Sequence, residues 1–293
     1  MNAAARPPLS VVIATRDRPE HLRRCLALLA GVVGPDDEVV VVDSASTSAE
    51  PGRVATAAGA RVVRADRPGT SLARNLGWRA AAHELIAFID DDVFVDEGWA
   101  DAMARALGAD ERAWVTGWIG VPEDQLHIPE PNPTMLVEHP MTLDADRRGT
   151  LGASANMGAK RRLLEEVGGF DERFGPGTWV SAAEDVELFD RFLLAGHDGY
   201  YDPAVRVYHD QWRTRRQAVS LHWRYGKGMG ARLARLVRHD AARACRGAYE
   251  FLGPDGVFAA GRCLRVRYEM GAVYAMLRVT GAVAGFLARM LRP

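Results

Sequence analysis

The segment Leu85–Asp92 constrains the fold of this chain more than any other stretch. Its first five residues are apolar and rich in isoleucine and phenylalanine, as in a buried strand, and Asp90–Asp92 follow with no basic neighbour. Adjacent carboxylates repel one another, so they destabilise a protein unless a positive group lies among them. Oxygen ligands at this spacing suit Mg²⁺ or Mn²⁺, ions that commonly hold phosphate oxygens. The alternative interpretation is a solvated acidic turn that caps a helix over 98–107.

Strands and helices alternate through the N-terminal half. The pattern predicts strands over 9–14, 38–42, 60–64 and 85–90, and helical stretches from Pro19, over 53–58 and over 71–82. Such alternation predicts an α/β fold, with a mostly parallel twisted sheet and helices on both faces.

Polar residues follow each of these predicted strands. They are Thr15-Arg16 after the first, Asp43 after the second, Pro68-Gly69-Thr70 soon after the third, and Asp90–Asp92 after the fourth. Ligands of open α/β sheets bind outside the carboxyl ends of the strands. A ligand site at this edge is therefore expected.

The chain of 293 residues is long enough for one large domain with an extension, and its net charge is −1. Near-neutrality argues against a general nucleic-acid binder. Between Arg206 and Arg246, however, eleven Lys or Arg face only two Asp, which points to an anionic partner such as a membrane surface or a phosphate group.

Cysteine usage and the N-terminus both favour a cytoplasmic protein. Cys25, Cys245 and Cys263 lie far apart and form no CxxC pair, so neither a zinc site nor a disulfide framework is indicated. The apolar run after the first residues is too short for a signal peptide. We therefore expect a reducing cytoplasm, with peripheral attachment to the inner face of the membrane as a further expectation.

An ordered set of motifs over about 9–210 resembles the inverting family 2 glycosyltransferases, which have the GT-A fold. Each motif is weak alone, and the ordered set is specific. It comprises Val11-Val12-Ile13-Ala14-Thr15-Arg16-Asp17-Arg18, Val41-Val42-Asp43-Ser44, Gly69-Thr70-Ser71-Leu72-Ala73-Arg74-Asn75-Leu76-Gly77, Asp90-Asp91-Asp92, Asn156-Met157-Gly158, Gly168-Gly169-Phe170-Asp171-Glu172 and Glu184-Asp185-Val186-Glu187-Leu188.

The resemblance implies a site for the nucleoside diphosphate of a sugar donor. Thr15 and Asp43 would line the nucleoside pocket, with Asp43 bonding the base and Arg16 beside them. Gly69 would allow close backbone approach, and Arg74 would lie near the base or diphosphate. The alternatives are a helix cap for Asp43 and a solvated helix position for Arg74.

The resemblance also implies a divalent cation, Mn²⁺ or Mg²⁺, as cofactor. Asp90 and Asp92 match the DxD pair of the family, with Asp90 near the ribose and Asp92 on the metal. Asp91 would belong to the same nucleotide-sugar site. His209 stands where some relatives place a metal or diphosphate ligand, and the alternative for it is a structural histidine.

The acceptor side follows from the same resemblance. Asp185 matches the catalytic base that takes a proton from the acceptor hydroxyl, and Glu184 and Asn156 would lie near the acceptor. A single base opposite the leaving group implies inversion in one displacement. Acids at the start of an amphipathic helix are also favoured electrostatically, which is the simpler interpretation of Glu184 and Asp185.

Two departures from the family pattern limit what the resemblance implies. Ser44 stands where the family often has a second aspartate, so the nucleotide base stays open. Gln211-Trp212-Arg213 lacks the spacing of the QxxRW motif of processive members, which favours transfer of one sugar per binding event.

Two segments are expected to be irregular. The proline-rich stretch 121–149 is expected to be a loop that shapes the substrate pocket, the alternative being surface decoration. Gly226–Gly230 lacks the context of a phosphate-binding loop and is expected to form a flexible turn between basic helices.

The C-terminal extension, 216–293, is expected to be helical and basic. Arg267, Arg278 and Arg289 lie eleven residues apart on nearly one face of an apolar helix, the pattern of a basic amphipathic helix at a membrane interface. Packing on the catalytic domain or a partner is the alternative, and spanning would bury Arg278 at the bilayer centre. Gly271, Gly281 and Gly285 argue against one long uninterrupted helix.

These observations predict a GT-A-type catalytic domain over 1–215, with a nucleotide-sugar half over 1–120 and an acceptor half over 121–215. The expected activity is metal-dependent, inverting transfer of one sugar, hexosyl-like, from a nucleoside-diphosphate sugar to an acceptor hydroxyl. The acceptor would be a glycan, a lipid-linked sugar or a secondary metabolite. The alternatives are a sugar-phosphate nucleotidyltransferase, which Thr15–Arg18 disfavours because it lacks glycine, and a catalytically silent nucleotide-sugar-binding protein.

Overall fold

The computed structural model describes residues 6–126, 134–146, 151–265 and 269–291, which form two compact units. Unit 1 comprises Met1–Asp144, Thr150–Phe170 and Arg191–Gln211. Unit 2 comprises Ala145–Gly149, Asp171–Asp190 and Trp212–Pro293. The segment Asp171–Asp190 therefore groups with the C-terminal helices, although it lies within the catalytic domain expected over 1–215.

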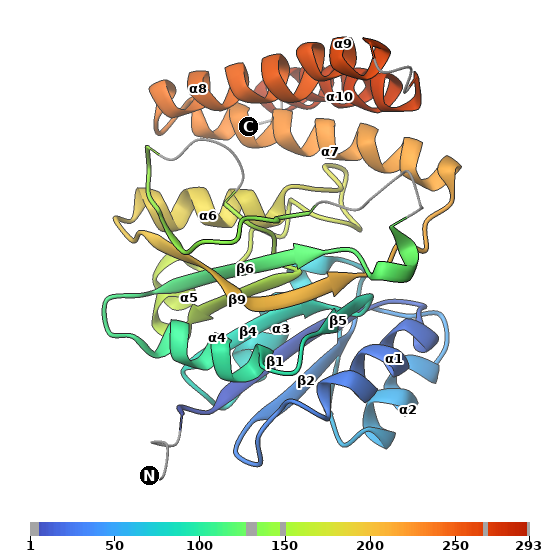
Figure 1. Ribbon diagram of the computed structural model, residues 1–293, viewed down its shortest axis with the longest axis vertical. Helices are drawn as coiled ribbons and strands as arrows, with labels where there is room; N and C mark the ends of the chain where they lie inside the picture. Colours follow the sequence, from blue (N-terminus) through green and yellow to red (C-terminus); the bar gives the residue numbers. More distant parts are fainter. Residues whose placement is uncertain (1–5, 127–133, 147–150, 266–268, 292–293) are drawn as a thin grey trace. The chain divides into compact units, whose positions relative to one another are not determined.

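A nine-stranded sheet forms the centre of unit 1 (Figure 1). Its strands are β1 (Leu9–Thr15), β2 (Glu38–Asp43), β3 (Arg61–Arg64), β4 (Leu85–Asp90), β5 (Val93–Val95), β6 (Trp114–Gly120), β7 (Met141–Leu143), β8 (Asn156–Lys160) and β9 (Gly199–His209). The order is β3-β2-β1-β4-β8-β6-β9-β5, and β7 pairs with β9. The four strands predicted in the N-terminal half are all present.

The helices of unit 1 connect and cover these strands. They are α1 (Pro19–Leu29), α2 (Glu50–Ala57), α3 (Thr70–Ala80), α4 (Trp99–Gly108), α5 (Arg161–Val167) and the 3₁₀ turn η1 (Glu123–Gln125). In Figure 1, α1, α2 and α4 lie on the near side of the sheet and α3 on the far side. Gly77 of α3 packs so closely on Val12 and Val42 that a Cβ would overlap the valine side chains.

The sheet is parallel in its first half and mixed in its second. β3, β2, β1 and β4 pair in parallel, and β4 and β6 both pair antiparallel with β8. Parallel neighbours need a long crossover connection, usually a helix. Within the described part of the segment before β8, the regular elements are only η1 and β7, so β8 enters from the opposite end of the sheet. The predicted α/β fold with helices on both faces is confirmed, with this antiparallel addition.

The proline-rich segment is more ordered than expected. Besides η1 and β7, Met135 forms an isolated antiparallel bridge with Ile119. Residues 127–133 and 147–150 lie outside the described residues. The expected role of this segment in shaping a pocket stays a prediction.

Unit 2 is built from helices. They are α7 (Arg215–Leu236), α8 (Ala241–Leu252), α9 (Phe258–Arg265) and α10 (Glu269–Leu291), with a π-helical turn over Gly253–Val257 between α8 and α9. Thr214 and Gln217 form a reciprocal capping box at the start of α7, and Asp240 caps α8. Helix α6 (Glu184–Leu194) begins in unit 2, and its last residues belong to unit 1.

The glycines of α7 and α10 form a close helix crossing, which corrects two expectations. Gly226 and Gly230 lie inside α7 rather than in a flexible turn, and α10 continues uninterrupted through Gly281 and Gly285. A Cβ on any of these four glycines would overlap a backbone oxygen of the partner helix. Small residues let helix backbones approach this closely, and the packing offsets the poor helix propensity of glycine.

Candidate functional site

The carboxyl ends of β1, β2 and β4 bring the predicted site residues of unit 1 to one edge of the sheet. Thr15 is paired in register with Asp43, and Ala14 with Asp90. Neighbours in register share a face and successive residues alternate, so Thr15 and Asp43 share one face of the sheet and Asp90 lies on the other, all three at the ends of their strands. The sheet edge expected from the sequence is therefore the edge at which Thr15, Asp43 and the aspartate triplet meet.

Two arginines from distant segments supply positive charge to the triplet. Arg74 of α3, 3% exposed, lies 2.7 Å from the carboxylate of Asp90. Arg18, in the loop after β1, lies 2.6 Å from Asp91 and 3.0 Å from Asp92. Burial lowers the pKa of Arg18, but the charges of Asp91, Asp92 and Asp90 outweigh it and raise the pKa, so the guanidinium stays charged. The positive group that adjacent carboxylates require comes from Arg18 and Arg74.

Asp90, Asp92 and His209 form a cluster suited to a cation. Their nearest ligand atoms all lie within 4.8 Å of one another. His209 is brought there by the antiparallel pairing of Val93 with His209, and its Nε2 lies 3.7 Å from Asp92. Two carboxylate oxygens and one imidazole nitrogen fit Mn²⁺, with positions left for diphosphate oxygens; Mg²⁺ prefers an all-oxygen set.

Asp91 has different surroundings from its two neighbours. It is fully buried, and the Thr15 hydroxyl donates to it at 2.7 Å. Burial raises the pKa of Asp91 to about 7, against the opposing charge of Arg18. The hydrogen bond between Thr15 and Asp91 therefore joins the end of β1 to the turn after β4 in the interior of unit 1.

The loop after β2 is tied to Gly69 through Ser44. The backbone N–H of Gly69 donates to the Ser44 hydroxyl at 3.0 Å, and that hydroxyl donates back to the Gly69 carbonyl at 3.3 Å. Asp43 is paired with Arg64 of β3 and accepts the backbone N–H of Ser46 at 2.8 Å. Asp43 thus closes its own turn and does not cap α2, which begins only at Glu50.

Two further predicted residues of unit 1, Arg16 and Asn156, are not members of the cluster. Arg16 is about half exposed, 45% for its side chain, and lies 3.4 Å from Asp17. Asn156 is fully buried, donates to the carbonyls of Trp118 and Val205, and accepts from the Trp99 indole. Its amide is satisfied by these three contacts within the core, and its expected place near the acceptor stays a prediction.

Sequence reasoning missed Arg18 and Arg64 as parts of this site. A signal was present for each, because Arg18 follows the first strand and Arg64 is the last residue of the third. Both strands end at the edge where ligands bind.

Asp185 and Glu184 belong to unit 2 and are described with it. They are the first two residues of α6, and the backbone N–H of Val186 donates to Asp185 at 2.8 Å. Ser181 and Ala183, immediately before, have φ of 63° and 68°. A positive φ is strained for residues with a Cβ, and such strain is concentrated at functional sites. The assignment of Asp185 as a base stays a prediction.

Arginines of α7 and α8 hold the start of α6. Arg232 binds both carboxylate oxygens of Asp190, at 2.6 and 2.8 Å, and Arg243 lies 3.3 Å from the same group. Arg235 lies 2.6 Å from Glu187. Bidentate arginine–carboxylate pairs fix geometry as well as charge. The helix that presents Asp185 is thereby anchored to the C-terminal helices of unit 2.

Comparison with curated proteins finds relatives among glycosyltransferases. The chain is 29% identical to the pre-mycofactocin glycosyltransferase of Mycobacterium tuberculosis over 258 residues. This alignment covers 81% of the chain and 51% of the relative. A putative glycosyltransferase EpsH of Bacillus subtilis is 28% identical over 106 residues, or 35% of this chain and 31% of EpsH. The chain thus spans about half the length, or less, of these curated relatives.

Solved structures support the fold. The mannosyltransferase PcManGT from Pyrobaculum calidifontis, in complex with GDP-Man and Mn²⁺, superposes with a TM-score of 0.66 at 18% identity, covering 96% of this chain and 88% of that one. TarS of Staphylococcus aureus in complex with UDP-GlcNAc gives a TM-score of 0.63 at 16% identity, covering 97% and 89%. At such identity the likeness shows the GT-A-type fold alone.

Family membership rests on the sequence itself. Residues 10–168, more than half of the chain, match the family model described as Glycosyl transferase family 2. That range contains the strands β1–β4, the loops that carry Arg18 and Gly69, and the aspartate triplet, so the resemblance inferred from the motifs is confirmed. The chain therefore belongs to glycosyl transferase family 2.

Proposed function

We propose that this chain transfers one sugar from a nucleoside-diphosphate sugar to an acceptor hydroxyl, with inversion and with the help of a divalent cation. The observation that carries the proposal is the cluster of Asp90, Asp92 and His209 at the carboxyl edge of a GT-A-type sheet. A Mn²⁺ or Mg²⁺ ion held there would offset the negative charge of the leaving diphosphate.

In this proposal, the predicted residues of the chain have separable roles. Arg74 and Arg18 hold Asp90 and Asp92 in place through ion pairs. Asp43 and the Ser44–Gly69 pair shape the loops for the nucleoside. Asp185 takes the proton of the acceptor hydroxyl, since hydroxyls are poor nucleophiles until a carboxylate accepts that proton at hydrogen-bond distance.

Nucleotide binding tests the site directly. GDP, UDP and dTDP, each with and without Mn²⁺, would be added to the protein, and the shift of its melting temperature measured. We expect one nucleotide to stabilise the protein only with Mn²⁺, and Asp92→Ala to abolish that shift. Asp110→Asn, which removes an exposed carboxylate, is the matched control and should behave as the unaltered chain. Equal stabilisation with and without Mn²⁺ would sink the metal assignment.

The nucleotide also selects which donors to screen. Solved structures of similar fold hold GDP-Man in one case and UDP-GlcNAc in another. A shift with GDP would direct the screen to GDP-mannose, and a shift with UDP to UDP-linked sugars. NMR of the product, in which the one-bond coupling between C1 and H1 reports the anomeric configuration, would test inversion.

We further propose that unit 2 contacts an anionic membrane surface, so that the acceptor is lipid-linked or membrane-bound. Residues 212–293 contain sixteen Lys or Arg and four Asp or Glu. An exposed apolar stripe runs along α10 at spacings of three, four and seven residues: Val273, Met276, Val283, Leu287 and Met290, each 42–55% exposed. An apolar helix face within a basic segment is the pattern of interfacial membrane binding.

Within the described residues, α10 is the one helix long and apolar enough to cross a membrane, a weak indication because core helices meet the same criterion. Its glycine face packs on α7, which carries Arg224, Lys227 and Arg232. If α10 lies along the membrane surface, it can stay packed on α7. If α10 spanned the membrane in the same packing, the charged side chains of α7 would lie against lipid.

Flotation with vesicles tests this contact. We expect binding to phosphatidylglycerol vesicles, weak binding to phosphatidylcholine vesicles, and release by salt. Met276→Glu with Leu287→Glu should abolish binding, whereas Leu126→Glu, at an apolar residue of unit 1 that is 69% exposed, should leave it unchanged. Equal binding by the two altered proteins would contradict the assignment of α10.

A further inference from the structure

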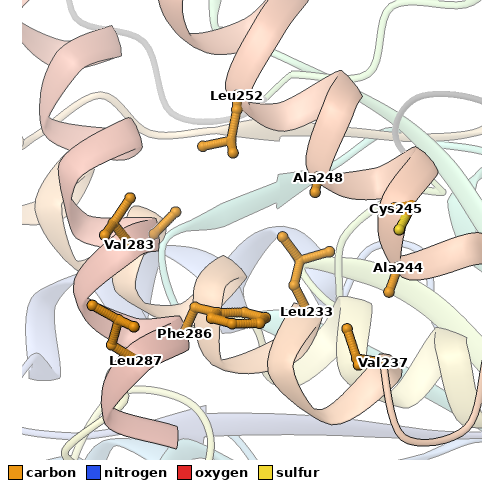
Figure 2. A pocket seen from close by; sticks show the side chains of 10 residues that line it. Leu233, Val237, Ala244, Cys245, Ala248, Leu252, Val283, Phe286 and Leu287 are labelled. Carbon is orange, nitrogen blue, oxygen red and sulfur yellow. The ribbon is translucent and has the colours of Figure 1, made fainter. Parts of the chain in front are cut away.

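Unit 2 contains an apolar groove between α7, α8 and α10. Figure 2 shows its lining side chains directed into the space between the three helices. They share an apolar character and are Leu233, Val237, Ala244, Cys245, Ala248, Leu252, Ala282, Val283, Phe286 and Leu287. The groove encloses a volume of about 330 Å³, within the range of small-molecule sites.

No polar side chain lines this groove among the described residues. Water in such a space lacks hydrogen-bond partners, and cavities of this chemistry take up apolar molecules. A nucleotide or sugar would lose hydrogen bonds to water there without replacement. The chemistry of the lining therefore selects a hydrocarbon.

The groove is continuous with the apolar stripe of α10. Val283 and Leu287 line the groove and also belong to that stripe, at 51% and 55% exposure. A hydrocarbon chain that enters beside them would pass from the membrane-facing stripe into the groove.

Charge decides between a lipid and a second copy of this chain as the occupant. The surrounding segment has sixteen basic and four acidic residues, so two copies brought face to face would repel each other. An anionic amphiphile would be attracted to the same segment. The arginine-rich recess formed by Arg173, Arg235, Arg238, His239 and Arg289, also in unit 2, adds to this field.

We propose that the α7–α8–α10 groove binds the hydrocarbon chain of an anionic membrane lipid. The proposal rests on the proposed membrane contact of unit 2 and extends it from a surface interaction to a defined lipid site.

Cys245 provides a probe of occupancy. It is exposed and lines the groove, whereas Cys25 is buried, with the pKa of its thiol raised by burial, and is thereby protected from alkylation. In a Cys263→Ser variant of the full chain, maleimide labelling would report on Cys245. Dodecyl phosphate below its micelle concentration is the probe ligand. We expect it to slow labelling about tenfold at saturation, and glycerol 3-phosphate to leave the rate unchanged.

Chain length and groove filling make the test specific. Shortening the chain to decyl phosphate should raise the concentration needed for half-maximal protection about 10- to 15-fold, as expected for two fewer buried methylenes. Ala248→Phe, and independently Leu252→Trp, should fill the groove and abolish protection. Ala242→Phe lies on the same helix, is exposed and does not line the groove, so it should retain protection.

Unchanged labelling with dodecyl phosphate would overturn the lipid site, as would full protection in both groove-filling variants. Vesicle flotation of Ala248→Phe separates the two proposals: retained flotation with lost protection supports a groove distinct from the surface contact. Failure of the unaltered chain to float would instead remove the membrane contact itself. Nucleotide-dependent melting reports on the transferase site independently of both.

Discussion

At the scale of single residues, the aspartate triplet shows how three identical neighbours acquire different surroundings. Asp90 faces Arg74, Asp91 is buried with Thr15 and Arg18, and Asp92 lies beside Arg18 and His209. Asp90 is the last residue of β4, whereas Asp91 and Asp92 lie in the turn that follows, where Asp91 is 0% exposed and accepts from Thr15. Asp90 and Asp92 can therefore contribute ligands to a cation, whereas the carboxyl of Asp91 is buried in the interior.

Asp185→Asn should separate chemistry from binding. If Asp185 takes the acceptor proton, kcat should fall by about 10²- to 10⁴-fold, because an amide cannot act as a base. Metal-dependent nucleotide binding should be unchanged, as measured by melting shift. Asp198→Asn, at an exposed position in the loop before β9, is the control and should leave kcat unaltered. An equal loss of kcat in both variants would contradict the role of Asp185.

At the scale of elements, unit 2 is organised by contacts between helices that are distant in sequence. Four glycines let α7 and α10 cross with their backbones in contact, and arginines of α7 and α8 anchor α6. The helix that carries Asp185 therefore depends on the C-terminal extension for its position.

Gly230→Ala should destabilise the helix crossing. Alanine has the better helix propensity by about 1 kcal/mol, but its Cβ would overlap the backbone of Ala282, and overpacking costs about 1–3 kcal/mol. We expect a net loss in the free energy of unfolding, measured with urea. Gly261→Ala in α9 is the matched control, since nothing lies near its Cβ, and it should be neutral or stabilising. A stabilised Gly230→Ala protein would show that the helices do not cross there.

Arg232→Met should loosen the anchor of α6. Breaking a buried ion pair usually costs about 3–5 kcal/mol, and we expect about 2–3 because Arg243 remains near Asp190. In the double variant Arg232→Met with Asp190→Leu, the carboxylate that Arg232 paired is also removed, but Arg243 loses its contact with Asp190, so only part of that stability should return. Urea unfolding of both proteins measures this, and a double variant no more stable than Arg232→Met would contradict the pairing.

At the scale of the whole molecule, the chain is two units whose segments interleave in sequence. Asp171–Asp190 leaves the sheet-bearing unit and joins the helices, while Arg191–Gln211 returns to the sheet. Charge is also distributed unevenly: unit 2 is basic, yet it contains the buried carboxylates Glu187 and Asp190 and the partly buried carboxylate Asp171. Stability of unit 2 should therefore depend on pH.

Acid should weaken unit 2 through Asp171. Burial would raise the pKa of this carboxyl, but hydrogen bonds from Arg173 and the charges of Arg173 and Arg235 lower it to about 2. A carboxyl with a lowered pKa stabilises the folded state above its unfolded pKa of about 3.9, and that contribution disappears as pH falls toward 2. After allowance for solvent screening, we expect a loss of about 1–2 kcal/mol.

Urea unfolding at pH 6 and pH 3 would measure this loss. The difference in stability between the unaltered chain and Asp171→Asn should be present at pH 6 and should shrink at pH 3. A constant difference across that range would show that the carboxylate is not held by the arginines.

Much of the sheet and half of the site were predictable because they depend on local patterns. Buried strands such as Leu85–Asp90 are recognisable from apolar β-branched runs, and polar residues at their ends mark the ligand edge. Arg18 and Arg64 were missed because pairing with Asp92 and Asp43 depends on the fold. The prediction of a flexible turn at Gly226–Gly230 was wrong. Glycine has a low helix propensity, and the helix packing that outweighs it cannot be inferred from the sequence.

The sequence by itself determined the family, the order of strands and helices from β1 to β4, and the edge at which acidic residues gather. These follow from periodicity and from residue type at strand ends, which act over a few residues. Tertiary structure alone decided that His209 joins Asp90 and Asp92, that two arginines neutralise the triplet, and that α7, α8 and α10 enclose an apolar groove. Those features need residues tens to more than a hundred positions apart to meet, because charge pairing and close packing depend on distance in space and not along the chain.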